Sequence, residues 1–329
     1  MSIPQNQINN IGGGGGERKV SIIVPCYNEV SNIKRFYDCT LEQLHFAQKQ
    51  IPNLDYEFIF INDGSTDDTL EILHHLAESD NRIKCLDFSR NFGKESAILA
   101  GLRHSHGDAI ILIDADLQDP AEFIPQMLYH HFIEGKDIVC VKRNDRSGDG
   151  VARRIFTHIF YKFHNLINTI KLDNGVRDFR LMSREVVDCI LEMGEYHRFS
   201  KAIFEWVGFE KIYLEYAYIP REAGVSGWSF WKLFKYAIEG IVSFSTAPLR
   251  IAFIAGFFAS LIALIYTIYI LIDTLIFGNP VKGYPSLVCI ILFLGGLQLI
   301  VLGIIGEYIA RIYEQVKHRP HYFIKKKKR

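Results

Sequence analysis

The chain has 329 residues, which is long enough for two or three structural units. Its 37 Lys and Arg residues balance its 37 Asp and Glu residues, which argues against a general nucleic-acid-binding protein. The six cysteines are scattered without Cys-x-x-Cys spacing, so we expect reduced thiols in a cytosolic setting and no zinc site.

The N-terminal segment is polar and lacks the apolar stretch of a secretory signal peptide. A glycine run at Gly12–Gly16 lies before the first apolar segment, whereas a phosphate-binding loop follows a strand. We therefore expect residues 1–18 to form a flexible leader.

Apolar, strand-like runs alternate with helix-like segments from Val20 to about Arg143. This alternation predicts an α/β fold, a mostly parallel sheet with helices on both faces. Ligands of such sheets bind beyond the carboxyl ends of the strands. The predicted strands are Val20–Val24, Tyr56–Ile61, Ile83–Phe88, Ala109–Ile113 and Ile138–Val141, and the predicted helices are Val30–Gln48, Asp67–Ala77, Lys94–His104 and Pro120–Glu134.

Two carboxylates, Asp114 and Asp116, directly follow the predicted strand Ala109–Ile113. Side chains two residues apart on an extended segment point to the same side, so the pair can hold one hard divalent cation. Mg²⁺ and Mn²⁺ share such carboxylates with substrate phosphates, and Gln118 offers a further oxygen ligand. A nucleotide-diphospho-sugar is the substrate that this arrangement suits, because negative charge builds on its diphosphate as the sugar departs.

Polar residues also follow the first two predicted strands, at Pro25–Glu29 and Asn62–Ser65. The segment Asn62–Asp68 has two interpretations: a turn with a helix cap, or a ligand-binding loop. The two are compatible if Ser65 or Thr66 caps the helix while Asp63 faces the ligand.

Two long apolar runs, Ile251–Ile272 and Leu287–Gly306, lack charged residues. Each can cross a hydrocarbon core of ~30 Å as a helix, and a pair of buried helices in a soluble protein is the alternative. The connector between them contains a single Lys or Arg residue, Lys282, whereas the chain after Glu307 contains eight Lys and Arg residues. The positive-inside rule then places both termini in the cytoplasm.

Three further segments lie at or near the predicted membrane surface. Trp228–Ile241 is aromatic-rich with interspersed charges, which is typical of a helix in the headgroup plane. Arg198–Val207 is either a second such helix or a core helix. The run Lys325–Arg329 is either a solvated tail or a contact for anionic headgroups.

A lipid phosphate is the acceptor that two membrane spans best fit, since two spans are too few for a conducting pathway. Its oxygen is already nucleophilic at neutral pH, because a phosphomonoester has a second pKa near ~6. The chemistry then needs cations that bring two phosphate-bearing substrates together. The candidates for these cations are Arg143, Arg153, Arg154, Arg177, Arg180 and Arg221. For each of them singly, the alternative is an ordinary charged residue on the protein surface.

Five motifs make the chain resemble the polyprenyl-phosphate glycosyltransferases of glycosyltransferase family 2, which include dolichyl-phosphate mannose synthase. They are Val24–Glu29, Asn62–Ser65, Ser89–Glu95, Asp114–Pro120 and Asp178–Met182. The C-terminal part is similar to bacterial bactoprenol glucosyltransferases of O-antigen modification, through Ser243–Arg250, Phe277–Pro280, Gly283–Ser286 and Gly306–Ile309.

The resemblance implies a GT-A type, Rossmann-like domain and a metal-dependent, inverting transfer from a nucleotide sugar, UDP-glucose above all, to polyprenyl phosphate. It implies a cytosolic catalytic domain over 19–227, an interfacial helix over 228–248, two transmembrane helices over 249–310 and a basic tail over 311–329. The protein would be a multi-pass, homo-oligomeric plasma-membrane enzyme with its catalytic domain in the cytoplasm, and a separate flippase would move the product.

The resemblance also assigns residues. Pro25, Tyr27, Glu29 and Asp63 match the positions that hold base and ribose. Asp114, Asp116 and Gln118 match the Mg²⁺ or Mn²⁺ and diphosphate positions, with Asp178 as a further catalytic residue. Arg143 and Arg221 match phosphate-binding arginines, and Arg153 matches the acceptor-phosphate position. Arg177 replaces a family glycine and Gly227 replaces a family lysine. One interpretation is that Arg177 partly replaces the missing lysine. The other is that Arg177 is a harmful change at a position where the chain needs a glycine backbone.

Three alternatives accompany this interpretation. The first is the same reaction with mannose or an amino sugar. The second is a processive polysaccharide synthase, for which the usual Gln-x-x-Arg-Trp motif and additional spans are not found in the sequence. The third is a catalytically silent, membrane-anchored scaffold, against which the intact pair Asp114 and Asp116 argues.

Overall fold

The structure is a computed structural model that describes residues 17–143, 176–216, 247–277 and 283–326. These residues form two compact units. The first contains the described residues up to Tyr216 together with the C-terminal segment that begins at Pro320. The second contains two long helices and the chain that follows them up to Arg319. The predicted leader lies outside the described residues except for Glu17 and Arg18, and Arg18 already begins the first strand.

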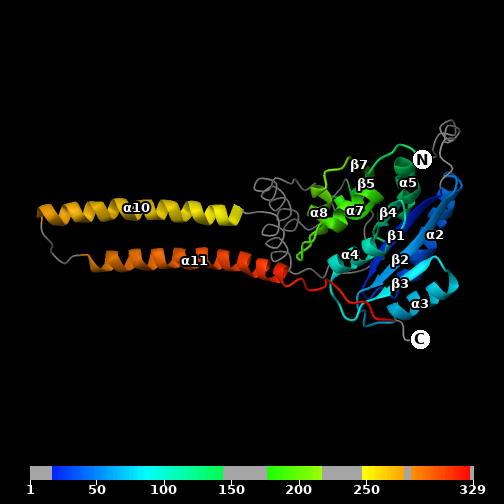
Figure 1. Cartoon of the computed structure of the whole chain (residues 1–329), viewed down its shortest axis with the longest axis horizontal. Helices are drawn as coiled ribbons and strands as arrows, with labels where there is room; N and C mark the ends of the chain where they lie inside the picture. The colour runs from blue at the N-terminus through cyan, green and yellow to red at the C-terminus, as the bar shows by residue number, and fades with distance from the viewer. Residues whose placement is uncertain (1–16, 144–175, 217–246, 278–282, 327–329) are drawn as a thin grey trace. The chain divides into compact units, whose positions relative to one another are not determined.

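A seven-stranded sheet forms the centre of the first unit. Its strands are β1 (Arg18–Cys26), β2 (Leu54–Asn62), β3 (Ile83–Asp87), β4 (Ala109–Leu112), β5 (Ile138–Arg143), β6 (Val176–Ser183) and β7 (Lys211–Tyr216). They lie in the order β3-β2-β1-β4-β6-β5-β7 (Figure 1). All neighbouring pairs are parallel except those of β6, which runs antiparallel to both β4 and β5. The prediction of a mostly parallel sheet is confirmed.

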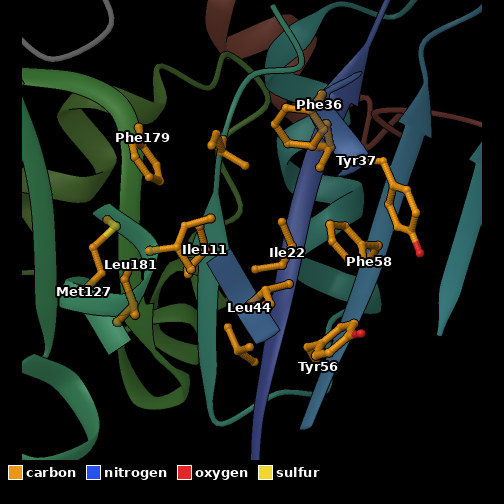
Figure 2. Close-up of a cluster of buried hydrophobic side chains, with 14 of the residues drawn as sticks. Ile22, Phe36, Tyr37, Leu44, Tyr56, Phe58, Ile111, Met127, Phe179 and Leu181 are labelled. Carbon is orange, nitrogen blue, oxygen red and sulfur yellow. The ribbon is translucent and has the colours of Figure 1, made fainter. Parts of the chain in front are cut away.

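Helices cover both faces of this sheet. They are α2 (Ile33–Gln48), α3 (Thr69–Ser79), α4 (Lys94–His104), the 3-10 turn η1 (Ala121–Phe123), α5 (Ile124–Phe132), α7 (Arg184–Glu192) and α8 (Ser200–Trp206). On one face Ile22 of β1 belongs to a buried cluster with Phe36 of α2 and Phe58 of β2 (Figure 2). Full burial of such a side chain stabilises the folded state by about 1.5–3 kcal/mol relative to leaving it exposed.

The opposite face of β1 packs against α4. Ile23 is fully buried there, and a Cβ added at Gly101 of α4 would lie 2.3 Å from Ile23 Cγ2. The absence of a side chain at Gly101 therefore lets α4 approach the strand closely. Because α4 begins at Lys94, this packing fixes the position of Lys94 beside the ends of the central strands.

The predicted elements up to Arg143 all occur, with small shifts at their ends. The predicted helix Pro120–Glu134 is divided into η1 and α5. The elements β6, α7 and β7 were not predicted. Of the two interpretations of Arg198–Val207, the burial of Ala202, Ile203 and Phe204 in α8 favours the core helix.

Two long helices, α10 (Ala247–Phe277) and α11 (Tyr284–Val316), pack against each other in the second unit (Figure 1). Large apolar side chains face outward from both, and Leu275 is 84% exposed. Among the described residues, one helical segment is long and apolar enough to cross a membrane, Phe293–Val316. The run Ile251–Ile272 lies within α10, and its crossing of the membrane stays a prediction.

Candidate active site

The loops after β1 and β2 are connected by hydrogen bonds from Asn28. Its backbone N–H donates to Ser65 Oγ at 3.0 Å, and its Oδ1 accepts from the Thr66 N–H at 2.8 Å. Asn28 has φ 57, a left-handed conformation that asparagine tolerates better than most residues. The neighbouring Tyr27 is 47% exposed, so its ring is available to a ligand.

Asp63 follows β2 and is buried at 4% exposure. Its two oxygens accept the backbone N–H groups of Phe92, at 2.7 Å, and Gly93, at 2.9 Å. Burial raises the pKa of Asp63, and the two amide hydrogen bonds oppose that rise. The carboxylate is therefore held in one orientation by the loop that precedes α4.

The predicted caps of α3 are wrong. Ser65 and Thr66 bind Asn28 of the β1 loop, whereas Asp67 Oδ1 accepts the Thr69 N–H at 3.1 Å at the start of the helix. Asp67 thus serves the start of the helix, and Asp63 lines the cleft described below; ligand binding by Asp63 stays a prediction.

Gly64 lies where the loop after β2 closely approaches the loop after β3, and this approach leaves no room for a side chain. Gly64 has φ +66, and a Cβ added to it would lie 2.4 Å from the backbone carbon of Arg90 and 2.5 Å from the backbone nitrogen of Asn91. Neither neighbour is the end of a flexible side chain, so a larger residue would push the two loops apart.

Lys94 lies between two carboxylates that come from different strands. Its Nζ is 2.7 Å from Asp114 Oδ2 and 2.6 Å from Asp178 Oδ2. Burial raises the pKa of Asp114, and the Lys94 ammonium opposes that rise. Burial also acts to raise the pKa of Asp178, but the charges of Lys94, Lys201 and Arg180 together outweigh it and hold that pKa well below its usual range. The sequence places Lys94 within the family motif Ser89–Glu95 but does not indicate its two partners.

Asp116 forms a tight turn with Gln118. The Gln118 N–H donates to Asp116 Oδ1 at 3.1 Å, and its side-chain amide donates to Asp116 Oδ2. Leu117 between them has φ 57, a conformation that costs a non-glycine residue roughly 1–2 kcal/mol. In the described part of the chain, Asp116 forms no ion pair with a lysine or arginine.

Arg177 pairs with Asp119 beyond this turn. Its Nε lies 2.5 Å from Asp119 Oδ1, and Asp119 is 4% exposed. Burial raises the pKa of Asp119, and the Arg177 charge opposes that rise. Arg177 Nη2 also donates to Gln118 Oε1 at 3.5 Å. In this structure, then, Arg177 compensates a buried carboxylate. The predicted replacement of a family lysine by Arg177 also involves position 227, and Gly227 lies outside the described residues.

One cleft of about 280 Å³ brings most of the predicted donor-site residues together. It lies at the carboxyl ends of β1, β2 and β4, as expected for a parallel sheet. The predicted residues that line it are Pro25, Tyr27, Glu29, Asp63, Asp114 and Asp116, and Asn91, Gly93 and Lys94 join them from the β3–α4 loop.

Comparison with known proteins places the chain in a family. Residues 21–191 match the family described as glycosyl transferase family 2, and residues 247–312 match the GtrB C-terminal hairpin. The chain is 49% identical over 311 residues to the SfII prophage-derived bactoprenol glucosyl transferase of Shigella flexneri, covering 94% of this chain and 99% of that protein. This chain belongs to glycosyl transferase family 2.

Two further relatives of this glycosyltransferase match it over a similar share of both chains. The prophage bactoprenol glucosyl transferase homolog of Escherichia coli K12 is 47% identical over 94% of this chain and 100% of its own. The putative glycosyltransferase CsbB of Bacillus subtilis is 45% identical over 93% and 91%. Among solved structures, the mannosyltransferase PcManGT of Pyrobaculum calidifontis with GDP-Man and Mn²⁺ is 17% identical over 88% of each chain, with a TM-score of 0.42.

Other predicted residues of the glycosyltransferase are not brought into the cleft by the described structure. Arg153 and Arg221 lie outside the described residues, and Arg143 is the last residue of β5. Arg180, a candidate phosphate cation, is 2% exposed, and its guanidinium lies 4.1 Å from the Phe204 ring centroid. Its Nη2 donates to the Arg177 carbonyl at 2.9 Å, so Arg180 acts within the core.

The oxygen donors at the end of β4 suit a hard divalent cation, since Asp114 and Asp116 share the cleft and Gln118 adjoins Asp116. No group of three or more His, Cys, Asp or Glu side chains arranged to hold a metal occurs among the described residues. The donor set is therefore two carboxylates with an adjacent amide, and remaining positions are left to substrate oxygens and water, as is usual for Mg²⁺.

Proposed function

We propose that this glycosyltransferase transfers glucose from UDP-glucose to a polyprenyl phosphate such as bactoprenol phosphate, with inversion at the anomeric carbon. The observation that carries the proposal is the identity of 47–49% over almost the whole chain, catalytic part and hairpin alike, with proteins named bactoprenol glucosyl transferase. The product serves cell-surface glycan modification after a separate flippase has moved it.

In this proposal the cleft binds the donor. The exposed ring of Tyr27 stacks on the base beside Pro25, while Glu29 and Asp63 hold the base and ribose. Asp114 and Asp116 would hold Mg²⁺ or Mn²⁺ with Gln118. When bound, the cation supplies positive charge to the diphosphate of the departing nucleotide.

The transfer itself breaks the bond between the anomeric carbon and the diphosphate oxygen, and forms one between that carbon and an oxygen of the lipid phosphate. The acceptor is already anionic, so the protein supplies orientation and cations rather than a strong base. Arg143, Arg153 and Arg221 are the proposed phosphate contacts. Arg177 acts there in addition to its pairing with Asp119. Lys94 keeps Asp178 ionised beside Asp114.

The hairpin places the enzyme at the plasma membrane. We propose that α10 and α11 both cross it, so that the catalytic domain and the C-terminus lie in the cytoplasm and residues near Gly283 lie outside. The exposed apolar side chains of both helices support this arrangement. A homo-oligomer remains an expectation.

Transfer of radiolabelled sugar into purified polyprenyl phosphate tests the proposal. We expect label in the lipid fraction with UDP-glucose, dependence on added Mg²⁺ or Mn²⁺, and little label with GDP-mannose or UDP-N-acetylglucosamine. Preferred transfer from another donor would support sugar transfer to the lipid phosphate but contradict glucose as the transferred sugar. No transfer from any donor, with the protein folded, would favour a silent scaffold.

A further inference from the structure

The C-terminal segment Pro320–Lys325, called here the tail segment, pairs with the edge of the sheet in the first unit. The Ser89 N–H donates to the Phe323 carbonyl at 2.9 Å, and the Lys325 N–H donates to the Asp87 carbonyl at 2.8 Å. Phe88 and Ile324 thereby form an antiparallel bridge at the end of β3, which is an edge strand. The tail segment covers backbone groups that an edge strand otherwise leaves open.

Side chains reinforce this pairing. The Tyr322 ring stacks on the fully buried Phe88, with centroids 5.0 Å apart and planes within 9°. The Phe323 ring centroid lies 6.1 Å from that of Phe92, and Phe92 in turn lies 5.8 Å from Phe88. Four rings, Phe88, Phe92, Tyr322 and Phe323, thus form one cluster between the tail segment and the β3–α4 loop.

The same loop orients the donor site. The N–H groups of Phe92 and Gly93 hold Asp63, and the next residue, Lys94, connects Asp114 with Asp178. At the start of the loop Asp87 accepts a 2.8 Å hydrogen bond from the side chain of Asn62, and the tail lysine Lys325 lies 3.1 Å from the other oxygen of Asp87. The loop therefore has the cleft on one side and the tail segment on the other.

We propose that the tail segment is a positioning element of the donor site. By fixing Phe88 and Phe92 it holds the amides of Phe92 and Gly93 toward Asp63, and it fixes the loop that enters α4 at Lys94. This inference rests on the proposed function, because it takes the cleft around Asp63 as the donor site. It also assigns Lys325 to Asp87, which leaves the lysines after it for the headgroup contact that the sequence offered as one interpretation.

The first test measures UDP binding in the presence of Mg²⁺ to the detergent-solubilised full chain by calorimetry. The double variant Tyr322→Ala with Phe323→Ala removes two rings of the cluster. Aromatic pairs contribute roughly 0.5–1.5 kcal/mol each, so we expect the Kd for UDP to rise about threefold to tenfold. The KM for the donor should rise by a similar factor, with the KM for the lipid acceptor unchanged. The ring-preserving variant Tyr322→Phe with Phe323→Tyr should bind UDP as the wild type does.

Two controls separate the tail segment from general effects. Lys326→Ala changes an exposed residue next to the tail segment, and Phe46→Ala removes a half-exposed ring on α2. Both should leave UDP affinity unchanged. Wild-type protein that binds no UDP would contradict the proposed function. Wild-type binding that the double variant retains in full would overturn the tail inference alone.

Hydrogen exchange supplies a readout that does not depend on activity. In the double variant the amides of Ser89, Phe92 and Gly93 should exchange at least about tenfold faster, while those of β1 keep their protection. If β1 also loses protection, Lys325→Pro gives the decision, since it removes the N–H and the ammonium that contact Asp87 and leaves all four rings of the cluster in place. Unchanged exchange of the loop amides in that variant would overturn the inference.

Discussion

Asp116 differs in its partners from three neighbouring carboxylates, Asp114, Asp119 and Asp178. Asp114 and Asp178 share the Lys94 ammonium, and Asp119 has Arg177. Asp116 is held only by Gln118 within the described residues, through the side-chain amide and the backbone N–H. Its charge is therefore more available to a divalent cation than the charges of those three neighbours.

We predict that Asp116→Asn abolishes sugar transfer while the protein stays folded and membrane-bound. Loss of cation-assisted stabilisation of the leaving diphosphate should reduce the rate roughly a thousandfold or more. Initial transfer rates measure this, with Asp55→Asn as the control, because Asp55 is an exposed carboxylate on β2. Near-wild-type turnover of Asp116→Asn, or full wild-type activity in excess chelator, would contradict it.

Arg177 and Asp119 form a buried pair whose members depend on each other. Arg177→Gln leaves the carboxylate of Asp119 without its compensating charge, and breaking a buried pair from one side costs about 3–5 kcal/mol. We predict a clear fall in the thermal unfolding midpoint in detergent, which Asp119→Asn should largely restore in the double variant. The exposed Arg35 on α2 provides the control Arg35→Gln. Strict additivity of the two single changes would exclude the coupling.

At the scale of elements, Glu57 of β2 joins its strand to β1, to β3 and to the loop before β4. This residue of β2 is 3% exposed, accepts from Ser21 Oγ of β1 at 2.7 Å and from the His106 N–H at 2.9 Å, and pairs with Lys84 of β3 at 2.8 Å. Burial acts to raise its pKa, but these donors outweigh it and lower the pKa of Glu57 to about 2. The ionised form thus contributes to the stability of the sheet.

This depressed pKa predicts an acid-sensitive contribution. Because the folded-state pKa lies below the unfolded-state value of 4.5, the stabilisation is complete above pH 4.5 and is lost as the pH falls through about 2. Ionised Glu57 contributes about 3 kcal/mol to the free energy of unfolding. Glu57→Gln should lower the unfolding midpoint at pH 7 and flatten its dependence between pH 4.5 and 2. Glu42→Gln, on the exposed side of α2, should do neither. Equal pH profiles for wild type and Glu57→Gln would contradict the assignment.

The loop–loop contact at Gly64 gives a third element-level expectation. Gly64→Ala adds a Cβ that would lie 2.4 Å from the Arg90 backbone, in a conformation that alanine rarely adopts. We predict weaker UDP binding, by about tenfold, with the sheet intact. Gly135→Ala is the matched control, since Gly135 also has positive φ but nothing within 4 Å of an added Cβ. Equal losses in both variants would attribute the effect to backbone strain alone.

The elements that the sequence predicts well are those with a continuous apolar pattern. Runs such as Ala109–Ile113 are fully buried and could be assigned to strands from their composition. The strand β6 was not predicted because it contains Arg177, Asp178 and Arg180. The first two are compensated by residues distant in the sequence, Asp119 and Lys94. The cleft was predictable because its residues follow parallel strands. The role of Lys94 was not, because it depends on where α4 lies.

For the whole molecule, the distribution of Lys and Arg predicts the orientation of the hairpin. A membrane-impermeant thiol reagent should label Gly283→Cys in intact cells, and should label Lys326→Cys only after permeabilisation. The native Cys39 is exposed on the catalytic unit and provides an internal reference, which the proposed orientation places in the cytoplasm. Labelling of Cys39 or Lys326→Cys in intact cells, with Gly283→Cys protected, would reverse the orientation.

The pairing of Phe88 with Ile324 joins the middle of the catalytic sequence to the end of the chain. During synthesis the N-terminal part of a chain folds first, and the ribosome releases the last residues only after α10 and α11 have been made. The sheet can therefore form early, while its edge waits for the final segment. A chain that stops before Pro320 would carry every cleft residue and still lack the last strand contact of its β3–α4 loop. On the proposed role of the tail segment, synthesis through Lys325 is a condition for a finished donor site, and that site is assembled only after α10 and α11 have been made.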